Sequence, residues 1–303
     1  MSGVTSANTP LKVGAVVITM GNRPEELRAL LDSVAKQDGD RVEVVVVGNG
    51  SPVPDVAEFS SVVRTVELPE NLGIPGGRNV GIEAFGPAGG DVDILLFLDD
   101  DGLLARTDTA ELCRRAFADD DRLGIVSFRI ADPDTGVTQR RHVPRLRAAD
   151  PMRSSRVTTF LGGANAVRTK VFAEVGGLPD EFFYAHEETD LAWRALDAGW
   201  MIDYRSDMVL YHPTTAPSRH AVYHRMVARN RVWLARRNLP VLLVPVYLGV
   251  WLLLTLARRP SRPALKAWFG GFREGWATPC GPRRPMKWRT VWRLTRLGRP
   301  PVI

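Results

Sequence analysis

Three consecutive aspartates, Asp99, Asp100 and Asp101, directly follow the apolar run ILLFL and precede a glycine. Their like charges repel one another, so this arrangement at the end of a buried strand costs free energy unless a positive group lies beside it. Residues i and i+2 of a strand project to the same side, so Asp99 and Asp101 can converge on one cation. Because magnesium is commonly held by one or two carboxylates together with substrate phosphates, the motif predicts a divalent-cation site. The alternative is a polar turn that simply follows the strand.

A second group of acids, Glu187, Glu188 and Asp190, stands at the start of the segment EETDLAWRALDAGW. Acids in the first turn of a helix can simply complement the helix dipole. The functional interpretation is that one carboxylate faces a pocket and acts as a general base. His212, in the sequence YHP, is either a third metal ligand or a packed histidine, and a single histidine is more often structural.

The segment NLGIPGGRNVGI combines a glycine-rich turn, a helix start and Arg78. Backbone N–H groups and a guanidinium suit a diphosphate. The segment lacks the strict spacing of a dinucleotide-binding fingerprint, so a purely structural glycine turn remains the alternative.

The elements that position these residues follow from the hydrophobic pattern. The apolar runs LKVGAVVIT, VEVVVVG, SVVRTVEL and DILLFLD read as strands, and PEELRALLDSVAKQ reads as an amphipathic helix. Near-continuous Val, Ile and Leu strands separated by helices indicate an α/β fold with a mostly parallel sheet covered on both faces. Ligands bind beyond the carboxyl ends of such strands, which are here residues 19–23, 48–51 and 99–102.

The second half of the chain is less regular. GIVSFRI is a predicted strand, and TTFLGGANAVRT is a predicted strand interrupted by Gly162 and Gly163. The acidic segment described above continues as a helix closed by Gly199, and VLYHP is a short strand that ends at His212.

Charge divides the chain into two parts. Residues 219–303 contain 18 Lys or Arg and one acid, Glu274, whereas residues 1–218 contain 22 basic and 33 acidic residues. The predicted organisation is therefore a domain over residues 1–218 and a basic helical extension over residues 219–303. Such an extension suggests an anionic partner, either nucleic acid or a phospholipid surface. The two cysteines lie far apart, and the first residues lack the layout of a secretion signal, so we expect a reducing cytoplasm.

The extension contains nineteen uncharged residues, 239–257, which is about the length needed to span a bilayer. Pro240, Pro245 and arginines on both sides argue against a simple span, and a buried pair of core helices is another interpretation. The many Trp and Arg residues favour an interfacial or re-entrant helix. This apolar stretch favours a membrane surface over nucleic acid as the anionic partner.

Taken together, the motifs resemble those of the family 2 glycosyltransferases of GT-A type. The resemblance covers about residues 12–213 and follows the family's order: TMGNRP, VVVVGNGS, ENLGIPGGRNVGI, FLDDDG, FLGGANAVRTKVFAEVGGLPDEFF, EETDLAWRALDAGW and YHP. Within the family, the chain looks most like bacterial rhamnosyl- and galactofuranosyl-transferases that build cell-surface polysaccharide.

The resemblance implies a role for each matching position. Asp99 and Asp101 would bind Mg²⁺ or Mn²⁺, with His212 as a late metal or diphosphate contact. Glu188 would be the catalytic base, flanked by Glu187 and Asp190. The remaining implied substrate contacts are Thr19, Asn22, Arg23 and Asn49 in the nucleotide pocket, Arg78 at the base or diphosphate, Asp100 beside the ribose, and Gly162 and Gly163 under the acceptor.

Two positions depart from the family pattern. Gly48 stands where the family usually carries an aspartate that contacts the nucleobase, which leaves the identity of the nucleotide open. Glu188 replaces the more common aspartate and reaches one methylene further, so the acceptor pocket must differ slightly.

The function expected from the sequence is a metal-dependent, inverting transfer of one sugar from a nucleotide-diphosphate donor to a hydroxyl of a glycan or a polyprenyl-linked acceptor. The expected location is the cytoplasmic face of the cell membrane, where the extension would set membrane contact and oligomerisation. Two alternatives stay open: a nucleotidyltransferase, although TMGNRP lacks the expected glycine- and lysine-rich phosphate loop, and a non-catalytic protein that binds sugar nucleotides.

Overall fold

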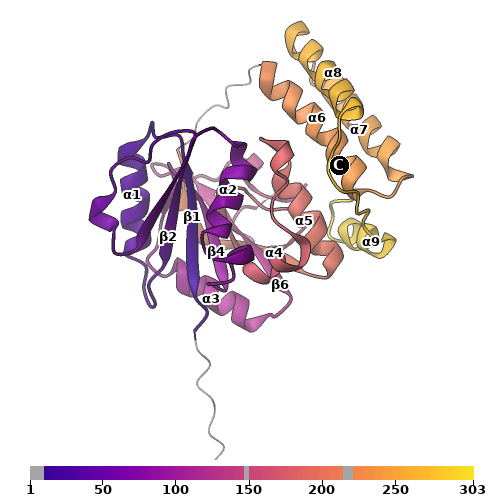
Figure 1. Cartoon of the computed structure of the whole chain (residues 1–303). Coiled ribbons are helices and arrows are strands. Elements are labelled where there is room, and N and C mark those ends of the chain that lie inside the picture. Colours follow the sequence, from indigo (N-terminus) through magenta and orange to yellow (C-terminus); the bar gives the residue numbers. More distant parts are fainter. Residues whose placement is uncertain (1–9, 147–149, 214–220) are drawn as a thin grey trace, which may run out of the picture.

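The structure is a computed structural model that describes residues 10–146, 150–213 and 221–303. A nine-stranded sheet forms its centre, with strand order β3-β2-β1-β4-β8-β6-β9-β5 and with β7 paired to β9. Helices cover both faces of this sheet, and four further helices pack beside it (Figure 1). The expected α/β fold with a helical C-terminal region is therefore confirmed.

The first four long strands are parallel, as the hydrophobic pattern predicts. They are β1 (Val13–Thr19), β2 (Glu43–Asn49), β3 (Val63–Leu68) and β4 (Ile94–Asp99). In the register of the sheet, Thr19 lies opposite Gly48 and Ile18 lies opposite Asp99. The carboxyl ends of β1, β2 and β4 therefore meet at one edge, where the predicted site residues follow them.

The second half of the sheet is mixed. The strand β8 (Ala164–Arg168) runs antiparallel to both β4 and β6 (Leu123–Ala131), while β9 (Met201–Tyr211) runs parallel to β6. Two short strands, β5 (Leu103–Leu104) and β7 (Ser155–Val157), pair antiparallel with β9. The regular strand that the sequence suggests around the two glycines begins only after them, at Ala164.

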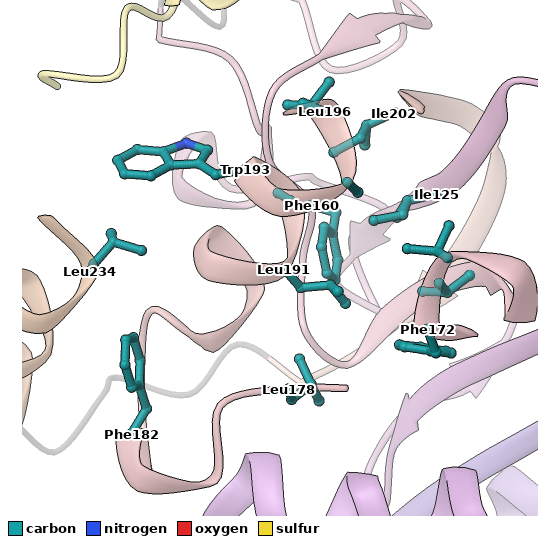
Figure 2. Packing of buried hydrophobic residues seen from close by; sticks show 14 of the residues in the cluster. Ile125, Phe160, Phe172, Leu178, Phe182, Leu191, Trp193, Leu196, Ile202 and Leu234 are labelled. Atoms are coloured by element: carbon teal, nitrogen blue, oxygen red, sulfur yellow. The ribbon is translucent and has the colours of Figure 1, made fainter. Parts of the chain in front are cut away.

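Two layers of hydrophobic side chains flank the sheet. One layer includes side chains of α1 (Pro24–Ala35) and α3 (Thr109–Asp119). The other includes side chains of α2 (Gly73–Glu83), α4 (Thr169–Val175) and α5 (Glu187–Ala198), several of which Figure 2 shows. Alternate residues of β1 enter opposite layers, because successive side chains of a strand point to opposite faces. Short 3₁₀ turns complete the unit at Ala57–Phe59, Pro87–Gly89, Arg140–His142 and Asp180–Phe182.

The C-terminal helices lie beside α5, on the opposite side of the molecule from α1 (Figure 1). They are α6 (Ala221–Asn238), α7 (Leu243–Ala257), α8 (Arg262–Ala277) and α9 (Trp288–Arg296). Their buried side chains Trp233, Leu234, Tyr247 and Leu294 belong to the same hydrophobic cluster as α5. The predicted domain boundary between residues 218 and 219 falls outside the described residues and stays a prediction.

The uncharged stretch forms a shorter helix than its length suggests. A turn at Pro240 precedes α7, which begins at Leu243 and contains 15 residues. Among the described residues, no helix combines the length and the apolar character needed to cross a bilayer.

Candidate active site

A cavity of about 500 Å³ opens at the carboxyl ends of β1, β2 and β4. It is the place that the parallel topology predicts for a ligand. Eight of the site residues expected from the sequence line it, namely Thr19, Asn22, Arg23, Asn49, Asp99, Asp100, Asp101 and His212.

The aspartate triplet forms the turn that ends β4. The backbone N–H of Gly102 donates to the Asp99 carbonyl, so the chain reverses tightly at this point. Asp100 is buried; it accepts a hydrogen bond from the Thr19 hydroxyl at 2.7 Å and contacts Arg23 at 3.3 Å. Burial raises the pKa of Asp100 against the opposing effects of these two partners. Its side chain therefore links β4 to β1.

Asp101 lies between two basic side chains. Its carboxylate is 2.6 Å from Nη1 of Arg23 and 3.1 Å from Nε2 of His212. Although burial disfavours its charge, the hydrogen bond from His212 and the charges of His212 and Arg23 hold the pKa of Asp101 below its usual value. In return, this hydrogen bond raises the pKa of His212. His212 is thus brought to the aspartates from the end of β9, as the sequence analysis anticipates.

Arg78 connects the aspartates to the acids of α5. Its guanidinium is buried and lies 3.3 Å from Oδ1 of Asp99 and 3.6 Å from Oε1 of Glu188. Asp99 and Glu188, almost ninety positions apart in the sequence, thereby meet at the guanidinium group of Arg78. Asp99 and Glu188 consequently lie close to each other, which neither local motif specifies.

Gly162 and Gly163 leave the space that this meeting requires. A Cβ atom at Gly162 would stand 2.0 Å from Oε1 of Glu188, and one at Gly163 would stand 1.9 Å from the carboxyl group of Asp99. Any larger residue at either position would displace a carboxylate. The two glycines, which immediately precede β8, therefore lie directly against the acids.

Glu187 and Glu188 form an interacting pair at the start of α5. Glu187 is fully buried, and one of its carboxyl oxygens has no hydrogen-bond partner. Burial, followed by the neighbouring charge of Glu188, raises the pKa of Glu187 well above its usual value. Burial also raises the pKa of Glu188, and the charge of Arg78 opposes that rise. This arrangement favours a neutral Glu187 beside an ionisable Glu188.

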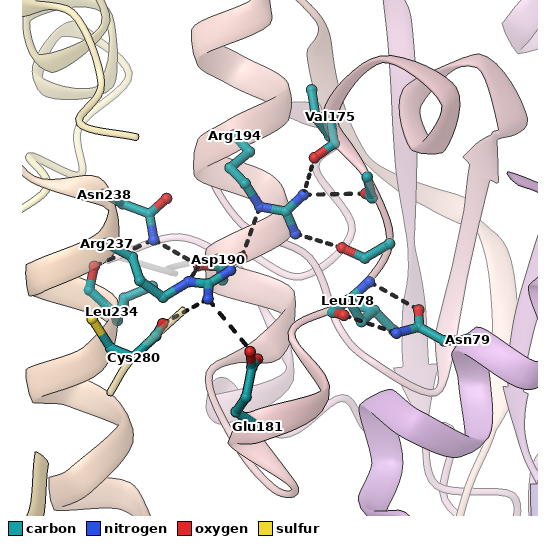
Figure 3. A network of polar contacts seen from close by, with 12 residues as sticks. Asn79, Val175, Leu178, Glu181, Asp190, Arg194, Leu234, Arg237, Asn238 and Cys280 are labelled. Atoms are coloured by element: carbon teal, nitrogen blue, oxygen red, sulfur yellow. Dashed lines mark hydrogen bonds and ion pairs between the residues drawn. The ribbon is translucent and has the colours of Figure 1, made fainter. Parts of the chain in front are cut away.

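None of the three acids in the first turn of α5 is among the described residues that line the cavity, and Asp190 belongs to a separate network. Its fully buried carboxylate accepts hydrogen bonds from Arg194 at 2.7 Å, Arg237 at 3.0 Å and Asn238 at 2.6 Å (Figure 3). Burial opposes its charge, but the two arginines dominate and lower the pKa of Asp190. The structure therefore places this predicted catalytic acid in a network that ties α5 to α6, away from the residues that it was expected to flank.

Asn49, which lines the cavity, and the preceding Gly48 form the end of β2. The Asn49 amide donates to the Gly73 carbonyl at 3.0 Å and accepts from the backbone N–H of Leu72 at 2.9 Å, so it fixes the start of α2. At Gly48, a Cβ atom would stand 2.2 Å from the Ser51 carbonyl oxygen. An aspartate at position 48 would therefore clash with this loop, which gives a steric reason for the glycine.

Asn71, Phe183 and Tyr184 are among the cavity residues that were not singled out from the sequence. The two aromatic residues precede the acids of α5 in a segment where Phe183, Ala185 and His186 all have positive φ angles. Such conformations are unfavourable for residues other than glycine and tend to occur at functional sites. The adjacent aromatic residues in EFFYAHEE were the only available signal, and the sequence carries no glycine to indicate the unusual backbone.

A divalent cation fits this site only together with a substrate. Among the residues that the structure describes, no three His, Cys, Asp or Glu side chains come together as a complete metal site. Asp99 and Asp101 nevertheless line the same cavity, and the Asp99 side chain is 38% exposed. Two carboxylates completed by diphosphate oxygens are a suitable donor set for magnesium or manganese.

Comparison with known proteins agrees with this geometry. The family described as Glycosyl transferase family 2 matches residues 15–176, which is more than half of the chain. A pre-mycofactocin glycosyltransferase of Mycobacterium tuberculosis is 27% identical over 232 residues, covering 73% of this chain and 44% of its own length. The chain thus spans less than half of the curated relatives it matches.

Solved structures show the same fold. TarS of S. aureus in complex with UDP-GlcNAc superposes with a TM-score of 0.62 at 19% identity, covering 89% of this chain and 82% of that one. GalNAc-T7 with UDP, GalNAc and Mn²⁺ gives 0.64 at 14% identity, covering 90% and 52%. The mannosyltransferase PcManGT from Pyrobaculum calidifontis, in complex with GDP-Man and Mn²⁺, gives 0.56 at 18% identity, covering 95% and 73%.

Proposed function

We propose how this chain, which belongs to glycosyl transferase family 2, uses its cavity: it transfers a sugar from a nucleotide-diphosphate donor to an acceptor hydroxyl, with inversion and with a divalent cation. The observation that carries the proposal is the contact of one buried arginine, Arg78, with both Asp99 and Glu188. This contact brings Asp99, a candidate cation ligand, and Glu188, a candidate base, next to the same guanidinium group.

The donor would lie along the carboxyl ends of the strands. Thr19, Arg23 and Asn71 line the cavity and would contact the nucleotide, and Phe183 and Tyr184 offer aromatic surfaces. Asp99 and Asp101 would hold the cation together with the diphosphate, as the Mn²⁺ complexes of two structural relatives suggest. When bound, this cation would stabilise the negative charge that develops on the leaving diphosphate. The rhamnosyl or galactofuranosyl character expected from the motifs remains part of this proposal.

Glu188 is the proposed general base. Its carboxylate takes the proton of the acceptor hydroxyl while the hydroxyl oxygen forms a bond to the anomeric carbon. The bond from that carbon to the diphosphate oxygen breaks, and the diphosphate leaves with the electron pair. Attack opposite the leaving group inverts the anomeric centre in one step. Arg78 supports this role because its positive charge favours the ionised form of Glu188.

We further propose that the acceptor is a glycan or lipid-linked molecule reached at the cytoplasmic face of a membrane. The supporting feature is an apolar surface around α7, formed by the exposed side chains of Val241, Leu242, Val246, Leu253 and Leu256. The exposed Trp288 and Trp292 of α9 stand among basic residues of the same extension. Apolar and tryptophan side chains beside arginines suit the headgroup region of an anionic bilayer.

The test compares two neighbouring isosteric variants. Glu188→Gln should retain donor binding and lose about 10²–10⁴-fold in kcat, because it removes a general base. Glu187→Gln should stay within about tenfold of wild type, because the amide resembles the neutral acid that burial favours at this position. Transfer would be measured with a panel of nucleotide sugars and Mn²⁺ or Mg²⁺, and donor affinity by calorimetry. Equal activity of wild type and Glu188→Gln would refute the assignment; binding without any transfer would favour a non-catalytic protein.

A further inference from the structure

A second, smaller pocket lies outside the cavity, between α5 and the C-terminal helices. Its volume is about 80 Å³. A buried water needs about 10–15 Å³ by the same kind of measure, so the pocket has room for a group of roughly five non-hydrogen atoms. Trp193, which extends from α5 toward the side where Leu234 of α6 lies (Figure 2), forms part of its apolar wall.

Two arginines line this pocket, and no Asp or Glu is among its described lining residues. Arg231 of α6 stacks on the Trp251 ring at 3.3 Å from its centroid, and its hydrogen-bond partner is the Tyr247 hydroxyl. Arg299 follows α9 and lies near the same tyrosine. Burial lowers the pKa of both guanidinium groups, and Tyr247 partly opposes this effect at each of them.

No Asp or Glu side chain supplies the missing charge, and Ile303, which also lines the pocket, takes part in none of the described ion pairs with either arginine. Residues 1–9, 147–149 and 214–220, which the structure does not describe, contain neither Asp nor Glu. Every carboxylate side chain of the protein is therefore described, and none of the described ion pairs includes Arg231 or Arg299. Buried charges in proteins are normally paired, so this pocket favours an anion from outside the chain.

Several other polar groups of the pocket can donate hydrogen bonds. Nη1 of Arg231, Nε1 of Trp251 and Nε2 of His186 are buried, and none has a partner within the described structure. The hydroxyls of Thr158, Thr159 and Thr189 add donors from two further segments. A ligand with several acceptor oxygens that point in different directions matches this set, and arginine pairs especially well with phosphate.

We propose that this pocket binds a phosphate group. The groups that surround it come from α5, α6, α7 and the segments after β7 and α9, so a bound phosphate would hold the C-terminal helices against the start of α5. His186 and Thr189 flank Glu187 and Glu188 in the sequence, so the start of α5 contributes both to this pocket and to the acids beside Arg78. Assigning the phosphate to a lipid-linked acceptor rests on the proposed function. Binding of free phosphate does not depend on that function.

The test uses the full chain without donor or divalent cation. Calorimetry with inorganic phosphate should show binding that Arg299→Gln weakens at least tenfold, while Arg273→Gln, which removes an exposed charge of α8, leaves it unchanged. Thr189→Val keeps the net charge and should weaken binding severalfold. Circular dichroism would verify that each variant is folded.

A second arm distinguishes the source of the phosphate. Phosphatidylcholine vesicles that contain a polyisoprenyl phosphate would be compared with vesicles of equal charge that contain phosphatidylserine. Binding to the first kind that depends on Arg299 identifies a lipid phosphate, and binding of inorganic phosphate alone identifies a free one. Equal behaviour of wild type, Arg299→Gln and Thr189→Val toward both probes would overturn the proposal, as would equal weakening by Arg273→Gln. Because no sugar is transferred in either arm, these results are independent of the proposed reaction.

Discussion

Replacing Asp190 by alanine tests whether this acid stabilises the fold or takes part in chemistry. The substitution removes the acceptor for Arg194, Arg237 and Asn238 (Figure 3). Arg237 and Asn238 are 7% and 3% exposed, so water cannot readily replace the lost carboxylate. Arg237 would then carry a buried positive charge whose closest remaining acid is Glu181, at 3.9 Å.

The expected cost follows from this burial. Removing one partner of a buried ion pair typically costs about 3–5 kcal/mol in the free energy of unfolding, which is a large share of an ordinary domain's stability. Asp207→Ala is the matched control, because Asp207 pairs with Arg205 at 2.6 Å while its side chain is 44% exposed. Such a surface pair contributes about 0–1 kcal/mol.

Urea unfolding of the three proteins would give these differences, and hydrogen exchange would show whether the amides of α6 lose protection. The pKa of Asp190 is lowered in the folded state, so its contribution is present above the unfolded carboxyl pKa and is lost as the pH falls through the folded value. The difference between wild type and Asp190→Ala should thus persist at pH 7 and shrink below about pH 4. A loss of transfer activity with unchanged stability would refute the reasoning and return Asp190 to the catalytic group.

Three further predictions concern the cavity and the extension. Gly163→Ala should weaken metal-dependent donor binding at least tenfold in calorimetry, since its Cβ would stand 1.9 Å from the Asp99 carboxyl; Gly270→Ala, with no atom within 4 Å, is the control that should bind normally. Burial raises the pKa of Glu188, and the charge of Arg78 opposes that rise. Arg78→Gln should therefore raise this pKa and move the acidic limb of the kcat/KM profile to higher pH. An unmoved limb would show that Arg78 does not influence the base. Leu253→Glu should reduce sedimentation with anionic vesicles, whereas Val137→Glu, at a comparably exposed site outside the extension, should not; equal binding of the two would count against α7 as the membrane contact.

Local pattern was enough to locate the strands and the edge at which they end. The Val- and Ile-rich runs that became β1, β2 and β4 are buried on both faces, which is why they lack the alternation of a half-exposed strand. Parallel strands place their carboxyl ends together, so Thr19, Asn49 and Asp99 could be assigned to one cavity without coordinates. The helix of Glu187–Ala198 was equally readable, because Gly199 ends it with a φ of 111°.

Local pattern could not tell which acid of that helix lies beside Arg78. Glu188 and Asp190 are two positions apart, and successive helical residues turn by about 100°, so the two side chains leave α5 in different directions. Which direction leads to Arg78 and which to Arg237 depends on how α5 packs between the sheet and α6. The same applies to Phe183, whose positive φ angle depends on its surroundings.

The basic extension shows the same division between what is local and what is not. Its charge and its nineteen uncharged residues could be read directly, since composition needs no structure. Its packing against α5, the shorter helix α7 and the pocket around Arg231 and Arg299 appear only when segments from five parts of the chain come together. The sequence by itself determined which groups the protein carries and where its regular elements begin. The tertiary structure alone decided which of those groups meet, because contacts between distant segments depend on the packing of the whole chain.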